Sequence, residues 1–197
     1  MDADQVAVLR ELLGPNRWLE RTRSFARALR GSARTPGGLL VVGTPDDEPW
    51  HLTAHLEQES RLADLPGLAP TLVRWEPPPG APPHLSVGLA RVEAARRGET
   101  LLVVSPDAAP VPLLERVHDA RRLGATILAL DQDDPALDEM AHESLAISPE
   151  LAPFSFDAAQ HLVSLAAGES AQSERPAGSF RGRLARLLDA VSGTPPP

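Results

Sequence analysis

Residues 98–130 read GETLLVVSPDAAPVPLLERVHDARRLGATILAL, and this stretch decides the fold. Residues 101–104 and 126–130 are short apolar runs, typical of strands in a parallel sheet that is covered on both faces. Between them, apolar residues recur with helical spacing over residues 111–123, and Gly124 follows as a helix stop. The stretch therefore predicts a strand, a helix and a second strand, joined by a right-handed crossover.

The same alternation continues on both sides of this stretch. Apolar runs predict further strands at residues 39–43, 71–75 and 144–148. Helical spacing predicts further helices at residues 4–13, 15–30, 50–62, 85–97, 135–142 and 156–167. Strands that alternate with helices predict an α/β fold, a three-layer αβα sandwich with a five-stranded parallel sheet.

We expect one domain over residues 1–168, which includes the N-terminal helices. Residues 169–178 are polar, contain Gly, Ser and Pro, and predict a linker. Residues 179–197 predict a C-terminal amphipathic tail. Its helical segment carries Leu184, Leu187, Leu188 and Val191 on one side. So short a helix is marginal alone, which leaves two hypotheses open: the tail docks on its own chain or dimer mate, or it binds a protein partner.

Composition and charge exclude several classes of protein and of site. The chain has no Cys, so disulfides, thiolate metal sites and a cysteine nucleophile are excluded. The formal net charge is −8, and the excess of acidic residues lies in residues 36–170, which disfavours nucleic acid as the main ligand. Residues 1–30 lack the apolar core of a signal peptide, and no stretch approaches the ~18 apolar residues of a membrane span. We therefore expect a cytoplasmic protein that does not contact membranes.

The segment 98–130 resembles the middle of a sugar isomerase (SIS) domain. In that family a strand ends in a Ser/Thr-rich loop, and the following helix closes with A-x-x-x-G-A directly before the next strand. Here the corresponding motif runs from Ala120 to Ala125. The resemblance spans residues 3–168 in layout. It implies a five-stranded parallel sheet, assembly into homodimers or tetramers, and a ligand site at the carboxyl ends of the strands.

The resemblance also implies two phosphate-binding loops, G-x-G-x-S after the first strand and S-x-S-G-x-S/T after a later one. Small residues let backbone N–H groups approach the phosphate, and hydroxyls add donors. Here the first loop, residues 43–49, has two prolines and three consecutive acids, and the second, residues 105–110, keeps one hydroxyl and no glycine. The candidate ligand-binding residues are Gly43, Thr44, Ser105 and Asp107. Such loops predict weak binding of sugar phosphates.

Three histidines raise the alternative of a zinc site. His51 and His55 are four residues apart on the predicted helix 50–62, so they share a face. This spacing is similar to the His and Glu that bind zinc in one SIS branch, the sedoheptulose-7-phosphate isomerases. His161 lies on the closing helix, which supplies further ligands in that branch, although the Gln160–His161 pair does not have the branch's spacing. No cofactor is favoured; zinc held by His51, His55 and His161 is the alternative to surface histidines.

Isomerisation of a sugar needs a base close to its C1 and C2 protons. The candidate bases are His55, Glu57 and Glu59. Asp131, Asp133 and Asp134 follow the fourth predicted strand on the ligand side of the sheet, where Asp133 or Asp134 is expected to cap the next helix. His118 and His142 fall within predicted helices.

Two functions from different classes follow from these observations. The first is a divergent, non-catalytic SIS-like domain that acts by oligomerisation, by protein interaction or by weak sensing of a carbohydrate derivative. The alternative is a phosphosugar (aldose–ketose) isomerase, metal-dependent if it is related to the sedoheptulose-7-phosphate branch. In either case we expect self-association, because the apolar stripes of residues 3–13 and 18–29 need cover.

Overall fold

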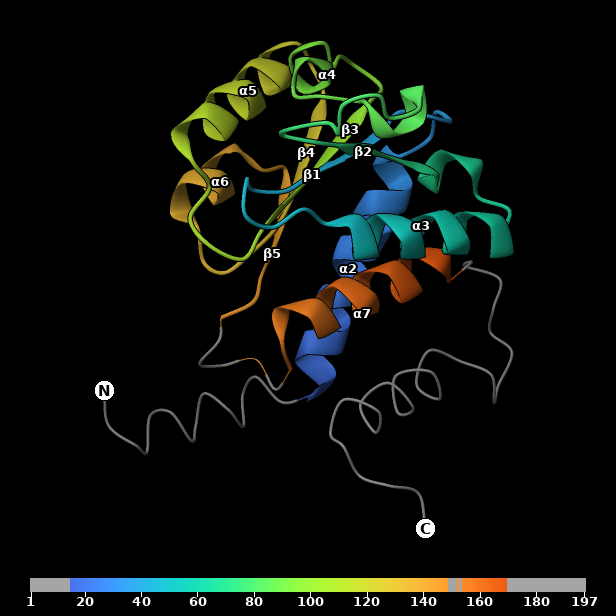
Figure 1. Ribbon diagram of the computed structural model, residues 1–197. Coiled ribbons are helices and arrows are strands. Elements are labelled where there is room, and N and C mark those ends of the chain that lie inside the picture. Colours follow the sequence, from blue (N-terminus) through green and yellow to red (C-terminus); the bar gives the residue numbers. More distant parts are fainter. Residues whose placement is uncertain (1–14, 149–151, 153, 170–197) are drawn as a thin grey trace.

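The computed structural model describes residues 15–148, 152 and 154–169 of the 197-residue chain, with side chains described from residue 18 onward (Figure 1). The predicted helix at residues 4–13, the linker from residue 170 on and the C-terminal tail lie outside the described residues. None of the helices in the described ranges combines the length and the hydropathy that crossing a membrane would require.

The described chain contains the five-stranded, all-parallel sheet that the apolar runs predict. The strands are β1 (Leu39–Val42), β2 (Pro70–Val73), β3 (Thr100–Ser105), β4 (Thr126–Asp131) and β5 (Glu143–Ala146). Their order in the sheet is β2-β1-β3-β4-β5, and each neighbouring pair is parallel. The predicted α/β fold is therefore confirmed.

Helices cover both faces of the sheet (Figure 1). One layer contains α2 (Pro15–Ser32), α3 (Trp50–Leu62) and α7 (Phe156–Gly168). The other contains α4 (Ala90–Glu93), α5 (Val111–Arg122) and α6 (Pro135–Met140). Within β1, Leu39 and Val41 join the core below the first layer, whereas Leu40 and Val42 join the core below the second. Because both faces are covered, the strand is apolar at every position.

The prediction of a helix at residues 85–97 is wrong. The chain instead forms the 3₁₀ turn η2 (Pro83–Leu85), a single bridge between Arg74 and Gly88, and the four-residue helix α4. The N–H of Arg74 donates to the carbonyl oxygen of Val87 at 2.8 Å, so this segment pairs with the chain just beyond β2. Tertiary pairing, together with the low helical preference of Gly88, outweighs the helical spacing.

His142 also lies outside the helix in which it was predicted, because α6 ends at Met140. Its backbone N–H donates to the carbonyl oxygen of Ile127 at 2.8 Å, and its Nδ1 accepts the N–H of Ile127 at 2.9 Å. Since Ile127 belongs to β4, these two bonds fix the start of β5 beside β4. His142 is therefore a structural residue at the amino end of the sheet.

The apolar stripe of α2 is covered within the described part of the chain. Trp18, Thr22, Phe25 and Leu29 are all buried. The Trp18 ring meets that of Phe154 edge-on, with 5.7 Å between ring centroids. At the other end of α2, Arg30 donates to the carbonyl oxygens of Ala166 and Ala167 at the end of α7. This helix therefore does not itself require cover from a partner.

Replacing Gly67 with Ala is expected to destabilise the fold. Gly67 lies in η1 (Pro66–Leu68), the 3₁₀ turn before β2, and a Cβ there would come within 2.2 Å of the carbonyl oxygen of Ala33. Relief of this overlap should cost about 1–3 kcal/mol of unfolding free energy, measured by urea denaturation.

Gly31→Ala is the matched control, because a Cβ at this helical position meets nothing within 4 Å. It should leave stability unchanged or raise it by up to about 1 kcal/mol. Equal effects of the two substitutions would contradict the packing described here.

Candidate functional site at the strand ends

The candidate site lies where the order of the strands reverses. The chain passes from β1 to β2 on one side and then returns to β3 on the other side of β1. In open parallel sheets ligands bind outside the carboxyl ends of the strands at such a switch point. The loops at residues 43–49 and 105–110 both leave the sheet at this point. They are the two loops to which the SIS resemblance assigns the phosphate.

The first loop closes on itself. The backbone N–H of Thr44 donates to the carbonyl oxygen of Asp47 at 3.1 Å, and the N–H of Asp47 donates to Oγ1 of Thr44 at 3.2 Å. Thr44 is buried. Pro45 and Pro49 have no N–H to offer. The N–H groups of Thr44 and Asp47 therefore hold the turn together and are not free to bind a phosphate.

Gly43 is required by close packing. A Cβ at this position would come within 2.0 Å of the carbonyl oxygen of Asp47 and 2.5 Å of Cδ of Pro49. The carbonyl oxygen of Gly43 accepts a hydrogen bond from Nε1 of Trp75 at 2.8 Å. The glycine of this loop thus lets the turn fold back against the end of β1, and no ligand is needed to explain it.

The second loop is also bonded internally. Ser105 is completely buried, and its hydroxyl donates to the carbonyl oxygen of Asp107 at 2.6 Å. The backbone N–H of Ala109 donates to Oδ2 of Asp134 at 2.7 Å. The other carboxylate oxygen of Asp134 accepts the N–H groups of Ala136 and Leu137, which caps α6. The expected cap is thus confirmed at Asp134, and its carboxylate also bonds the loop after β3.

Asp131 lies beneath this cap, at the end of β4. Its side chain is completely buried, Oδ1 accepts the backbone N–H of Asp134 at 3.1 Å, and Oδ2 has no hydrogen-bond partner. The pKa of Asp131 is raised to about 6, chiefly by burial and also by the nearby carboxylates of Asp138 and Asp134. The prediction that Asp131 follows the fourth strand is wrong, because it is the last residue of β4.

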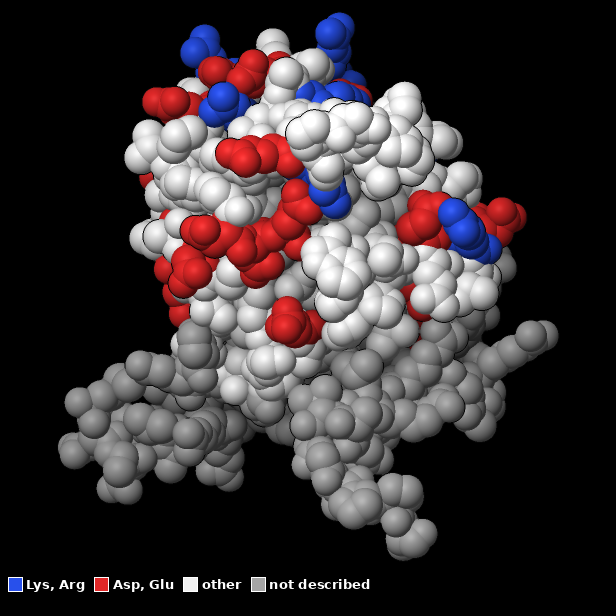
Figure 2. All heavy atoms as spheres, viewed as in Figure 1, with Lys and Arg blue, Asp and Glu red and all other residues white. Residues whose placement is uncertain are grey.

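Acidic side chains converge above the two loops. Partial burial raises the pKa of Asp47, and the negative charges of Asp157 and Asp107 add to this increase. Figure 2 shows acidic side chains gathered on the face that carries these loops. Glu48 is paired with Arg74 at 3.2 Å. The switch point thus presents negative charge where the SIS resemblance expects an anion.

Two of the three histidines proposed as zinc ligands meet between α3 and α7. The rings of His55 and His161 lie edge to face, with 4.4 Å between centroids. The ring of His51 instead lies against Trp50, at 3.5 Å between centroids. Burial lowers the pKa of His55, and the proximity of His161 and His51 lowers it further. The structure therefore pairs two imidazoles and places the third beside another aromatic ring.

A structural zinc site uses four protein ligands, and a catalytic one uses three with an open position. Within the described ranges, no three His, Asp or Glu side chains form a group that could hold a metal ion. The pair His55–His161 supplies two imidazole ligands, which falls short of either arrangement.

The three candidate bases on α3 have different neighbours. His55 faces His161, whereas Glu57 forms an ion pair with Arg61 one turn along the helix. Glu59 is buried, and its Oε2 is so close to Gly168 that a Cβ there would lie 2.0 Å away. Of the three, His55 is the one that the structure brings beside another titratable ring.

Three contacts of the site were not predicted from the sequence. They are the bond between Asp134 and Ala109, the bond between Trp75 and Gly43, and the burial of Asp131. The two bonds join residues that are distant in the chain, and the burial of Asp131 depends on packing around the end of β4, so no local pattern reports them. The parallel register offers one signal, because it pairs Ser105 with Asp131 at the ends of adjacent strands.

Comparisons with known proteins agree with the fold. No model of a protein family and no curated protein matches the chain. Among solved structures, the chain is similar to a "putative phosphosugar isomerase" from Silicibacter pomeroyi, with a TM-score of 0.57 and 18% identity over 96% of this chain and 54% of that one. It is also similar to a "putative sugar binding protein" from Salmonella typhimurium, with a TM-score of 0.56 and 16% identity over 95% of this chain and 53% of that one.

A "putative phosphosugar isomerase" from Salmonella typhimurium gives a TM-score of 0.51 and 13% identity, over 89% of this chain and 50% of that one. The chain thus spans about half the length of these structures. Likeness at this identity concerns the fold, and the SIS-like fold that the sequence resemblance predicts is confirmed.

Asp131→Asn should remove a pH dependence of stability. A pKa raised from 3.8 to about 6 means that the folded state holds this proton more tightly than the unfolded state. Stability is therefore lost as the pH rises from about 4 to about 6, by about 3 kcal/mol if Asp131 is considered alone. Relative to the wild type, Asp131→Asn should gain stability over this window in urea denaturation.

Asp133→Asn is the control, because Asp133 is exposed and its left-handed backbone (φ of 62°) also suits Asn. Its stability difference from the wild type should not vary with pH. A constant difference for Asp131→Asn as well would contradict the raised pKa.

Proposed function

We propose that this chain is a non-catalytic SIS-like domain that works by association and does not hold a phosphosugar at its strand ends. The observation that carries the proposal is the internal bonding of the switch-point loops. Thr44, Ser105 and the N–H of Ala109, which would face a phosphate, all bond to the protein itself. A ligand would have to break these bonds before it could make its own.

Electrostatics supports the same proposal. Asp47, Asp107 and Asp157 lie close enough together to raise the pKa of Asp47. Repulsion between a phosphate and one carboxylate about 4 Å away costs about 1 kcal/mol in water and about 4 kcal/mol at an effective dielectric constant of 20. Several carboxylates at the site would therefore offset much of the binding free energy that a helix N-terminus offers an anion.

Self-association is the activity that the exposed surface favours. Trp50 and Val111 begin α3 and α5 at the same edge of the sheet, and their side chains are 54% and 65% exposed. Aromatic residues are enriched at protein interfaces.

The alternative function is a phosphosugar isomerase that uses His55 as its base. The contact between His55 and His161 favours this alternative, since a lowered pKa keeps His55 neutral and able to accept a proton. It requires a sugar phosphate to bind in spite of the acidic loops, so a binding measurement separates the two proposals.

Sugar phosphates should bind with millimolar affinity or not at all. Isothermal titration calorimetry with fructose-6-phosphate and sedoheptulose-7-phosphate tests this directly. Micromolar binding of either ligand, reduced by His55→Gln, would contradict the proposal and support the isomerase. The control is His118→Gln, a substitution of an exposed histidine on α5.

The purified chain should form a homodimer at micromolar concentration, as measured by light scattering. Trp50→Ser should shift the equilibrium toward monomer, because it removes an exposed aromatic side chain at the strand-end edge. Leu123→Ser is the control: Leu123 is 55% exposed but follows the far end of α5. A monomer throughout the micromolar range would refute association.

A further inference from the structure

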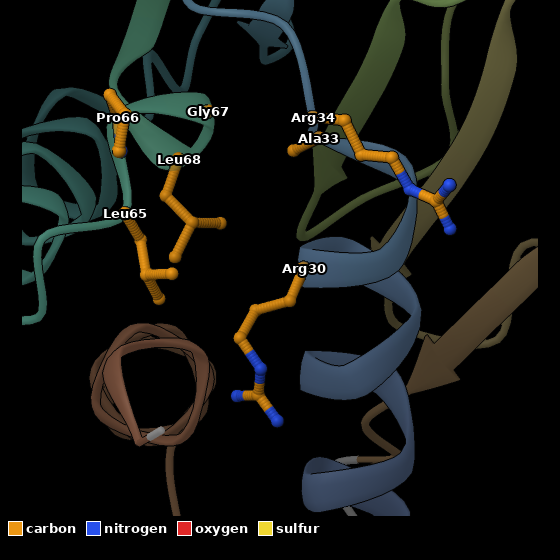
Figure 3. Close-up of a pocket in the computed structure, with 7 residues that line it drawn as sticks. All are labelled: Arg30, Ala33, Arg34, Leu65, Pro66, Gly67 and Leu68. Carbon is orange, nitrogen blue, oxygen red and sulfur yellow. The ribbon is translucent and has the colours of Figure 1, made fainter. Parts of the chain in front are cut away.

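A cavity lies at the edge of the sheet opposite the carboxyl ends of the strands, where the candidate site is. Its volume is about 260 Å³, and it opens between the end of α2 and η1 (Figure 3). The lining residues are Arg30, Ala33, Arg34, Leu65, Pro66, Gly67 and Leu68. Because α2 leads into β1 and η1 leads into β2, the cavity faces the amino ends of the strands. It is therefore separate from the switch-point site.

The walls of this cavity are held firmly. Gly67 packs so closely on Ala33 that a Cβ would overlap its carbonyl oxygen. The N–H of Leu65 donates to the carbonyl oxygen of Ser60 at 2.8 Å, and that of Leu68 donates to the carbonyl oxygen of Leu65 at 2.9 Å. The cavity is therefore lined by backbone that hydrogen bonds and close packing fix in place, where α3, η1 and α2 meet.

The arginines of the lining do not make it an anion site. Arg30 already donates to the carbonyl oxygens of Ala166 and Ala167, and its burial lowers its pKa. The Nε of Arg34 donates to the carbonyl oxygen of Gly31, and Figure 3 shows its guanidinium directed away from Leu65 and Leu68. The other lining residues are leucine, proline, alanine and glycine, so the cavity suits an apolar occupant.

The size of the cavity favours side chains over a free small molecule. Pockets for small molecules usually have volumes of about 300–1,000 Å³. This cavity falls below that range. Beside it, Leu62 at the end of α3 is 70% exposed and precedes the lining residue Leu65 by three positions.

The chain itself leaves the described fold at this cavity. Arg30 contacts the carbonyl oxygens of the last turn of α7, and the charge of Glu169 raises the pKa of Arg30 against the effect of burial. The 28 residues from 170 to 197 therefore start next to the cavity. The sequence of this segment repeats apolar residues at helical spacing, which predicts one apolar stripe: Phe180, Leu184, Leu187, Leu188 and Val191.

We propose that residues 180–191 dock on this cavity in the same chain, with apolar side chains of the stripe filling it. The ten residues 170–179 form the tether. A random-coil chain of ten residues has a root-mean-square span of about 16–19 Å, which covers a site adjacent to its origin. Such a tether gives an effective concentration in the millimolar range, above the micromolar concentration of a second copy. Docking in the same chain is therefore favoured over docking on a partner.

Amide hydrogen exchange on the full-length chain tests the proposal. Leu184→Asp places a charge in the stripe, and the amides of Leu65, Leu68 and Ala69 should then exchange about tenfold faster. Ala185→Asp is the matched control, because its position lies outside the stripe, and it should leave these rates unchanged. Equal rates in the wild type and both variants would overturn the proposal.

A reciprocal variant and a labelling experiment complete the test. Leu65→Gln alters the cavity wall and should speed exchange of the amides of residues 184–188, whereas unchanged rates there would overturn the proposal. Because the chain has no Cys, one cysteine placed at Arg34 and one at Arg183, a position that flanks the stripe, report only on this contact. In a mixture of isotopically light and heavy chains, the disulfide should form within single chains. Light–heavy pairs would assign the contact to a second copy and overturn docking in the same chain.

Discussion

The strand-end site depends on one carboxylate, that of Asp134. One of its oxygens accepts the N–H of Ala109 from the loop after β3, and the other accepts N–H groups of Ala136 and Leu137 at the start of α6. Hydrogen bonds to an ionised acceptor are roughly twice as strong as neutral ones. Asp134 thus supplies a negative group to backbone donors in the place where a SIS domain is expected to receive the phosphate of its ligand.

The same interaction determines the environment of Asp131. The N–H of Asp134 donates to Oδ1 of Asp131, which holds a second carboxyl beneath the first and out of contact with water. Its raised pKa lowers stability at neutral pH. Asp47, Asp107 and Asp157 add negative charge above it. The carboxyl-end edge of the sheet therefore carries acidic side chains at its surface, and the backbone N–H groups beneath them are bonded to protein carboxylates. Both properties disfavour an anionic ligand.

The sequence predicts the fold better than the site. The three central strands β1, β3 and β4 are predicted by continuous apolar runs because both of their faces are covered, whereas the edge strands β2 and β5 are only partly buried and have weaker apolar patterns. The prediction of a helix at residues 85–97 fails because Gly88 pairs with Arg74, which is distant in the chain. At the site the residue types predict weak phosphate binding, but the inward hydrogen bond of Ser105 follows from tertiary packing and could not be read from the sequence. The H-x-x-x-H spacing correctly places two histidines on one helix, yet the pairing of His55 with His161 depends on how α3 meets α7.

The most direct test of the central claim is an NMR titration of the full chain, labelled with ¹⁵N, with fructose-6-phosphate. The amides of Thr44, Asp47 and Ala109 already donate to protein acceptors. Internal bonding of these donors predicts that their signals show no saturating shift below millimolar concentrations of the ligand. Shifts of these three amides that saturate at micromolar ligand would contradict it, because they would show that a phosphate displaces the internal bonds.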